Sequence, residues 1–171
     1  MNDQNREKKK KTPAGKVVTF LGILFVLIPV LAAAVLLVPR IAGYEEYIIS
    51  SGSMEPDYPV GSLIFVEDKE PHQIGAGEVM TFRSAGGESV VTHRVVKNDT
   101  AKGEIITKGD ANKENDFLPV KYEKVIGVVV NCIPEAGFAA GLARDMKGII
   151  LIVSMIGAGF ALLIAATYMK K

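Results

Sequence analysis

Serine, histidine and aspartate side chains that could together perform hydrolysis occur in three short stretches of the sequence. Ser51 and Ser53 stand in SGSMEP, where a strand-like alternation of apolar and polar residues breaks off. His93 stands in SVVTHRVV, and Asp110 and Asp116 stand in TKGDANKEND. A serine hydroxyl becomes a nucleophile when an imidazole takes its proton and a carboxylate supports the imidazole. These residues make up the inventory of a serine hydrolase, which is weak evidence by composition alone because almost any chain contains the three types.

The elements that must position these residues are short β-branched runs separated by Gly and Pro, a pattern typical of a mostly β unit. Period-two alternation puts His93 on one strand face with two valines, and Arg94 on the opposite face, where we expect an ion-pair or surface role. Hairpin turns are predicted at residues 85–87 and around 98–103. The predicted strands are Glu46–Ser50, Ser62–Val66, Glu78–Arg83, Ser89–Val96, Glu104–Thr107 and Val125–Ile133.

Two uncharged runs flank the β unit and are long enough to cross a membrane as helices. Val17–Val38 has 22 residues without a charge, and Gly148–Tyr168 has 21. A 22-residue helix is ~33 Å long, and a hydrocarbon core is about 30 Å thick. A cleaved secretory signal is the alternative for the first run, but a cleavable apolar core usually has only about 7–15 residues. The residues after this run, Pro39-Arg40-Ile41, also do not resemble a small-residue cleavage site.

The chain is therefore predicted to have five parts. They are a basic tail at 1–16, a transmembrane helix at 17–39, an exported β catalytic domain at 40–147, a second transmembrane helix at 148–168 and a tail at 169–171. In the second helix Gly157, Ala161 and Ala165 recur at four-residue spacing, which could let another helix approach closely. Small residues are also simply common in such helices, and the sequence does not decide between the two readings.

Charge predicts the orientation of the two helices. Residues 1–16 hold six basic and two acidic side chains, whereas residues 40–147 hold 12 basic and 17 acidic ones. The positive-inside rule then puts both termini in the cytoplasm and the acidic middle outside. An acidic folded part also argues against a nucleic-acid partner. The single Cys132 falls in a strand pattern without companion ligands at metal spacing, so we expect a structural cysteine.

Three motifs in order, SGSMEP, THRVV and TKGDANKEND after an amino-terminal apolar helix, resemble the type I signal peptidases. These are membrane-bound serine proteases that remove signal peptides from exported proteins. The resemblance is to their endoplasmic-reticulum-type branch, which also occurs in archaea and some Gram-positive bacteria. The usual bacterial branch has a lysine base at the corresponding strand, and this chain has His93 there. The matching segments span about Ser51 to Asp116.

The resemblance implies a role for each motif residue. Ser53 would be the nucleophile and His93 its general base. Ser51 would lie beside the oxyanion hole, its hydroxyl joining the Ser53 backbone N–H. An aspartate completes the site in this branch, and two positions match. Asp116 is favoured as the partner of His93, with Asp110 supporting the turn, and both remain candidates.

The resemblance also implies the activity and its setting. We expect a serine endopeptidase, signal peptidase I, that cleaves signal peptides from exported preproteins at the outer membrane surface without a metal or organic cofactor. Its expected location is the cell membrane, multi-pass, with both termini cytoplasmic and the active site extracytoplasmic. Expected partners are signal-peptide-bearing preproteins and the lipid bilayer, with the secretion translocon as a further candidate. The competing interpretations are a non-catalytic membrane-tethered β scaffold subunit and a related protease with another exported target.

Overall fold

A computed structural model describes residues 12–84, 86–87 and 89–169 of the chain. The chain divides into two compact units. One unit, Leu36–Gly141, contains a β-sheet, and the other combines Met1–Val35 with Leu142–Lys171. The cytoplasmic tails predicted from the sequence fall mostly outside the described residues.

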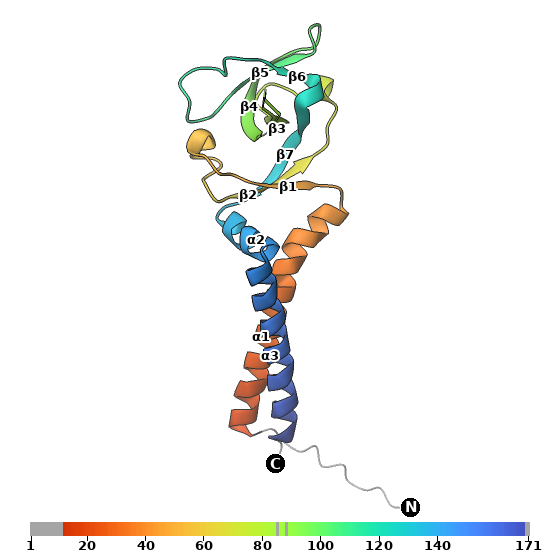
Figure 1. Cartoon of the computed structure of the whole chain (residues 1–171), viewed down its shortest axis with the longest axis vertical. Helices are drawn as coiled ribbons and strands as arrows, with labels where there is room; N and C mark the ends of the chain where they lie inside the picture. Colours follow the sequence, from red (N-terminus) through yellow and green to blue (C-terminus); the bar gives the residue numbers. More distant parts are fainter. Residues whose placement is uncertain (1–11, 85, 88, 170–171) are drawn as a thin grey trace, which may run out of the picture. The chain divides into compact units, whose positions relative to one another are not determined.

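The β unit is built on one antiparallel sheet of seven strands, whose curled ribbon is visible in Figure 1. Its spatial order is β1-β2-β7-β3-β4-β5-β6. The expectation of a mostly β domain between two apolar helices is thereby confirmed. The strands are β1 Glu45–Ile48, β2 Leu63–Glu67, β3 Val79–Arg83, β4 Val90–Asp99, β5 Glu104–Lys108, β6 Val120–Lys121 and β7 Val125–Ile133.

The predicted strands agree with six of these seven elements to within a few residues. The last prediction has the bounds of β7, and both predicted hairpins exist as the antiparallel pairs β3–β4 and β4–β5. The two-residue β6 was not predicted, because a pair such as Val120–Lys121 is too short to show alternation. The sequence also did not predict α2, Ala136–Arg144, or three short 3₁₀ helices, η1 Gly52–Met54, η2 Pro71–Gln73 and η3 Tyr122–Lys124.

Strand β4 is paired on both sides along only part of its length. It pairs with β3 from Val90 to Arg94, but its pairing with β5 begins only at Arg94. Two hydrogen bonds, from Ser84 N–H to Ser89 O and from Val95 N–H to Glu78 O, both 2.8 Å, show that the backbone groups of Ser89 and Val95 point toward the β3 side. By alternation, the backbone N–H and C=O groups of Val90 and Thr92 point away from β3. The first half of β4 is therefore an open strand edge.

Three apolar clusters hold the sheet in its curled form. The largest lies between β3, β4, β5 and β7, and the second lies beside β1 and β2. The third joins the start of β2 to α2. Their fully buried members include Met80 and Ile105 in the first, Ile64 and Val66 in the second, and Leu63 and Ala140 in the third.

One glycine sets the path of the chain into β2. Gly61 has φ +85°, a backbone conformation that residues other than glycine rarely adopt. A Cβ at this position would also collide with the ring of Phe138. Its N–H donates to Ile49 O, and its C=O accepts from Gly137 N–H, both at 2.8 Å. Gly61 thus ties α2 to the segment that follows β1.

The other unit contains α3 Met146–Tyr168 and the part of α1 Pro13–Ile41 that ends at Val35, and these two helices run side by side in Figure 1. Both are long and apolar enough to cross a membrane. They meet at Gly22 and Gly159, where a Cβ on either glycine would lie 3.0 Å from the other's carbonyl oxygen. A Cβ on Gly157 would meet open space, so the close approach uses Gly159 and not the Gly157 spacing considered from the sequence.

Candidate active site

Ser53 lies in η1, the short helical turn between β1 and β2. The turn is anchored by its last residue, Met54, whose side chain is buried and only 1% exposed. It is held from the side by the Ser53 carbonyl, which accepts the Ala111 N–H at 2.9 Å. A small-residue turn of this kind leaves the serine hydroxyl free to face outward while its backbone is fixed.

His93 extends from the middle of β4 toward this turn. Its Nε2 lies 3.2 Å from Ser53 Oγ. The residue is 9% exposed, and the ring of Phe82 meets the imidazole edge-on at a centroid distance of 6.4 Å. Alternation along β4 predicted the face on which the imidazole lies, and burial on an apolar face requires polar partners for both ring nitrogens.

Asp116 provides the second partner of the imidazole. Its Oδ2 lies 2.6 Å from His93 Nδ1. A carboxylate can only accept here, so Nδ1 carries a proton and the Nε2 of a neutral ring presents its lone pair to Ser53. Asp116 is itself held by Thr107, whose hydroxyl donates to the same Oδ2 at 2.6 Å and whose carbonyl accepts the Asp116 N–H at 2.8 Å.

Asp110, the other candidate carboxylate, bonds to Arg94 instead of His93. The guanidinium Nη2 and Nε donate to its two oxygens at 2.6 and 2.8 Å. Arg94 also reaches Asp57 Oδ2 at 3.1 Å and the Gly77 carbonyl at 2.9 Å. The hydrogen bonds from Arg94 to Asp110 raise the pKa of the guanidinium further above its usual value. Arg94 therefore forms the expected ion pair, and it links the loop after Ser53 to the loop that leads to Asp116.

Ser51 lies beside Ser53, with 3.1 Å between the two hydroxyl oxygens. Its backbone is extended, with φ −131° and ψ 155°, directly before η1. A hydroxyl at this distance can donate toward an oxygen that bonds near Ser53 Oγ.

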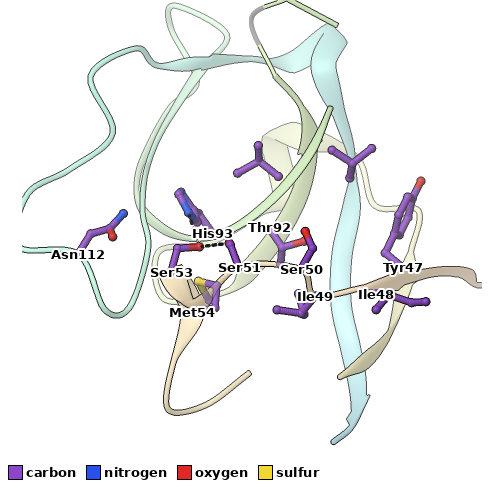
Figure 2. Close-up of a pocket in the computed structure, with 12 residues that line it drawn as sticks. Tyr47, Ile48, Ile49, Ser50, Ser51, Ser53, Met54, Thr92, His93 and Asn112 are labelled. Carbon is purple, nitrogen blue, oxygen red and sulfur yellow. Dashed lines mark hydrogen bonds between the residues drawn. The ribbon is translucent and has the colours of Figure 1, made fainter. Parts of the chain in front are cut away.

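Ser51, Ser53 and His93 line a cleft of ≈ 360 Å³, which lies between the end of β1 and the open edge of β4. Figure 2 shows Ser53, Ser51 and His93 around one part of the cleft and Tyr47 at the other end. Burial raises the pKa of Tyr47 to about 12, assisted by a hydrogen bond to Glu45, so this phenol stays protonated at neutral pH. The lining residues are Tyr47, Ile48, Ile49, Ser50, Ser51, Ser53, Met54, Val90, Val91, Thr92, His93 and Asn112.

The structure brings together Ser53, Ser51, His93 and Asp116 and places Asp110 on Arg94. Among the described residues, no group of three or more His, Cys, Asp or Glu side chains could hold a metal ion. Sequence reasoning missed Thr107. The sequence signal for it was its position two residues after Ile105, because period-two alternation then places both side chains on the same, inward face of the strand.

No protein-family model matches the chain. Comparison with curated proteins, however, finds relatives that are named as signal peptidases or as catalytic subunits of a signal peptidase complex. Signal peptidase I W of Bacillus subtilis (strain 168) is 37% identical over 113 residues, 60% of this chain and 58% of that protein. The signal peptidase complex catalytic subunit SEC11 of Pyricularia oryzae is 32% identical over 103 residues, 53% of this chain and 59% of that subunit. Human SEC11C, also named a signal peptidase complex catalytic subunit, is 36% identical over 108 residues, 57% of this chain and 56% of that subunit.

The chain thus spans somewhat more than half the length of the curated relatives it matches. The resemblance to type I signal peptidases, first seen in three short motifs, is confirmed by these relatives. They include both a bacterial enzyme and catalytic subunits of the eukaryotic complex.

Proposed function

We propose that this chain is a membrane-anchored serine endopeptidase that cleaves signal peptides from exported preproteins, as the names of its relatives suggest. The observation that carries the proposal is the bridging position of His93. Its imidazole lies 3.2 Å from Ser53 Oγ on one side and 2.6 Å from Asp116 Oδ2 on the other. This is the order of contacts that a nucleophile, a base and an orienting carboxylate require.

In the proposed mechanism, Ser53 Oγ attacks the scissile carbonyl carbon while its proton passes to His93 Nε2. The Asp116 carboxylate stabilises the imidazolium that forms. The same proton is then given to the leaving amine, which departs and leaves an ester on Ser53. Water hydrolyses the ester by the reverse path, with His93 again as base.

The oxyanion of the tetrahedral intermediate would be stabilised by the Ser53 N–H and the Ser51 hydroxyl. Support for Ser51 is its hydroxyl oxygen, 3.1 Å from Ser53 Oγ. A donor next to the nucleophile, where negative charge develops, is worth more in the transition state than in the ground state.

The substrate would bind as an extended segment in the cleft. The backbone groups of Val90 and Thr92 point away from β3, on a part of β4 that β5 does not cover. An extended peptide can add to such an edge through its main chain, and pockets beside the strand then select alternate side chains. We infer that the bound segment lies just after a signal peptide's hydrophobic core, with small residues before the cut.

The proposed location is the cell membrane, with spans at 17–39 and 148–168 and the β unit outside. Support comes from the two apolar helices and from the basic charge of residues 1–16. The proposed partners are preproteins and the bilayer, with the secretion translocon as a further candidate. Single cysteines introduced at position 5 and at position 86, in a Cys132→Ala background, test the orientation in intact cells. A membrane-impermeant reagent should label only the second, and labelling of the first would refute this orientation.

Cleavage of a preprotein by the purified full chain in liposomes tests the activity. The wild type should release a product whose new amino terminus, read by mass spectrometry, follows the apolar core of the signal peptide. Ser53→Ala should release none while keeping the wild-type melting temperature. Ser89→Ala, which removes an exposed hydroxyl from the β3–β4 hairpin, is the matched control and should cleave at the wild-type rate.

Two outcomes would contradict the proposal. Cleavage by Ser53→Ala would show that another group is the nucleophile. Folded wild-type protein that cleaves no preprotein would instead favour the non-catalytic scaffold, the competing interpretation of the sequence.

A further inference from the structure

We propose that Thr107 is a positioning residue, which holds the Asp116 carboxylate in the orientation that supports His93. The inference rests on the proposed function. It assigns a task to a side chain that touches none of the reacting atoms and that the sequence motifs did not single out.

Thr107 lies on β5 directly opposite Val95 of β4. Val95 is two positions after His93 and so lies on the same face of the strand, which makes Thr107 the diagonal neighbour of the imidazole. Thr107 has no exposed surface. The neighbouring atoms therefore hold its side chain in one rotamer, whereas the side chain of a surface threonine can rotate.

The loop around Asp116 offers that residue no packing of its own. Asp116 is half-buried, whereas residues 111–115 before it and 117–119 after it are all exposed. Phe117, its immediate neighbour, is 97% exposed. The contacts that orient Asp116 must consequently come from outside the loop.

Thr107 supplies two such contacts at once. Its carbonyl accepts the Asp116 N–H at 2.8 Å, and its hydroxyl donates to Asp116 Oδ2 at 2.6 Å. The second bond ends on the same oxygen that accepts from His93 Nδ1. The first bond fixes the backbone and the second fixes the side-chain rotation, so Oδ2 stays aimed at the imidazole.

Without the hydroxyl, the carboxylate can turn toward water, because 22% of its side-chain surface is exposed. A solvated carboxylate stabilises an imidazolium less than one in direct contact does. Substrate binding involves neither residue, so the loss should appear in kcat and not in KM.

A purely structural role is the alternative, since a buried hydroxyl generally needs a partner whatever its neighbours do. Tyr122→Phe provides the matched control for it. That variant deletes a hydroxyl that donates to Asn98 Oδ1 at 2.7 Å, and Tyr122 does not line the cleft.

The test compares Thr107→Val, Thr107→Ser and Tyr122→Phe in the full chain, by preprotein cleavage across pH. Thr107→Val keeps the shape of the side chain and should lower kcat about tenfold at unchanged KM. The acid limb of its pH–rate profile should move about half a unit to one unit lower, because the protonated imidazole is less supported. Thr107→Ser should restore both values, and Tyr122→Phe should change neither.

A second readout does not depend on cleavage. In a His72→Gln background His93 is the single histidine, so isotope-labelled imidazole gives one NMR titration curve. Its midpoint should move down in Thr107→Val and return in Thr107→Ser. If the wild type cleaved nothing while these midpoints moved as stated, the proposed function would fail and the role of Thr107 would stand.

Three results would overturn the inference. The first is that kcat and the titration midpoint of His93 are both unchanged in Thr107→Val. The second is that this midpoint moves upward. The third is a loss of kcat that Tyr122→Phe reproduces while the midpoint does not move. An upward midpoint would mean that the hydroxyl competes with the imidazole for the carboxylate instead of holding it in place.

Discussion

Replacing each of the two loop aspartates with asparagine should give opposite results, although the residues lie six positions apart in one motif. Asp116→Asn removes the charge in contact with His93, whereas Asp110→Asn removes a charge bound to Arg94. Asparagine keeps the size and shape of aspartate. The pair of variants therefore removes one negative charge at each place with little change of volume.

The magnitude for Asp116→Asn follows from the geometry of its contact. With Oδ2 2.6 Å from Nδ1, the imidazolium and carboxylate charges are centred about 4 Å apart, and at an effective dielectric constant of about 20 they attract by about 4 kcal/mol. Removing that attraction from the transition state corresponds to a loss of about 10³ in kcat/KM. An amide that turned its NH₂ toward Nδ1 would add to the loss, because it would favour the tautomer whose Nε2 cannot accept the serine proton.

Asp110→Asn should leave catalysis within about tenfold of wild type and act on stability instead. It leaves the guanidinium of Arg94 with Asp57 and the Gly77 carbonyl as partners. Loss of a hydrogen bond between charged groups costs about 1.5–3 kcal/mol, reduced here because a third of the Arg94 side chain is exposed. A lower melting temperature with an unchanged pH–rate profile is the expected signature.

The assay is initial-rate cleavage of a preprotein between pH 5 and 9, with thermal unfolding of each variant measured in the same detergent. The reasoning predicts a large rate loss in one variant and a stability loss in the other. It is refuted if Asp110→Asn loses the larger part of kcat/KM, or if Asp116→Asn retains more than about a tenth of the wild-type value.

Other outcomes follow from the same contacts. Ser51→Ala should cut kcat by about 10²–10³ with a residual rate, since one oxyanion donor is lost and the nucleophile remains, and kinetics at saturating substrate would show it. His93→Lys should stay inactive in the cleavage assay, because a lysine beside Asp116 is held as a cation and cannot accept a proton. The hydrogen bond from Lys69 lowers the pKa of Glu78 from 4.5, so this pair stabilises the fold above that pH and the gain is lost as the pH falls through the lowered value. Lys69→Met should therefore lower the melting temperature at pH 7 by a small amount, because the pair is about one third exposed, and the difference from wild type should disappear as the pH falls through the lowered pKa of Glu78.

The strands were predictable where local chemistry alone decides them. Six of the nine residues in Val125–Ile133 are β-branched, and the predicted bounds of this strand are those of β7. Period-two alternation was also sufficient to place the His93 imidazole and the Arg94 guanidinium on opposite faces. By contrast, α2 follows β7 with only weak sequence signals, and it is fixed by contacts such as Gly137 N–H with the carbonyl of Gly61, far away in the sequence.

The choice between the two aspartates could not come from spacing. Both stand in a loop without periodicity, so no face can be assigned to either. What separates them in the structure is a cation on β4 that binds Asp110 and a hydroxyl on β5 that binds Asp116. These partners lie 16 and nine residues away along the chain. Only the register of the β4–β5 pair brings them to their places.

The position of β7 has a consequence for when the candidate site forms during synthesis of the chain. It is the last strand to leave the ribosome, yet it lies between β2 and β3 and joins the two halves of the sheet. Ser53 belongs to the half with β1 and β2, and His93 and Asp116 belong to the other. A nascent chain ending before Val125 lacks the strand that pairs with both halves, and contacts between the halves are then limited to hydrogen bonds such as Ala111 N–H to Ser53 O and Arg94 to Asp57. We therefore expect the contact between Ser53 and His93 to become stable when this final strand pairs with both β2 and β3.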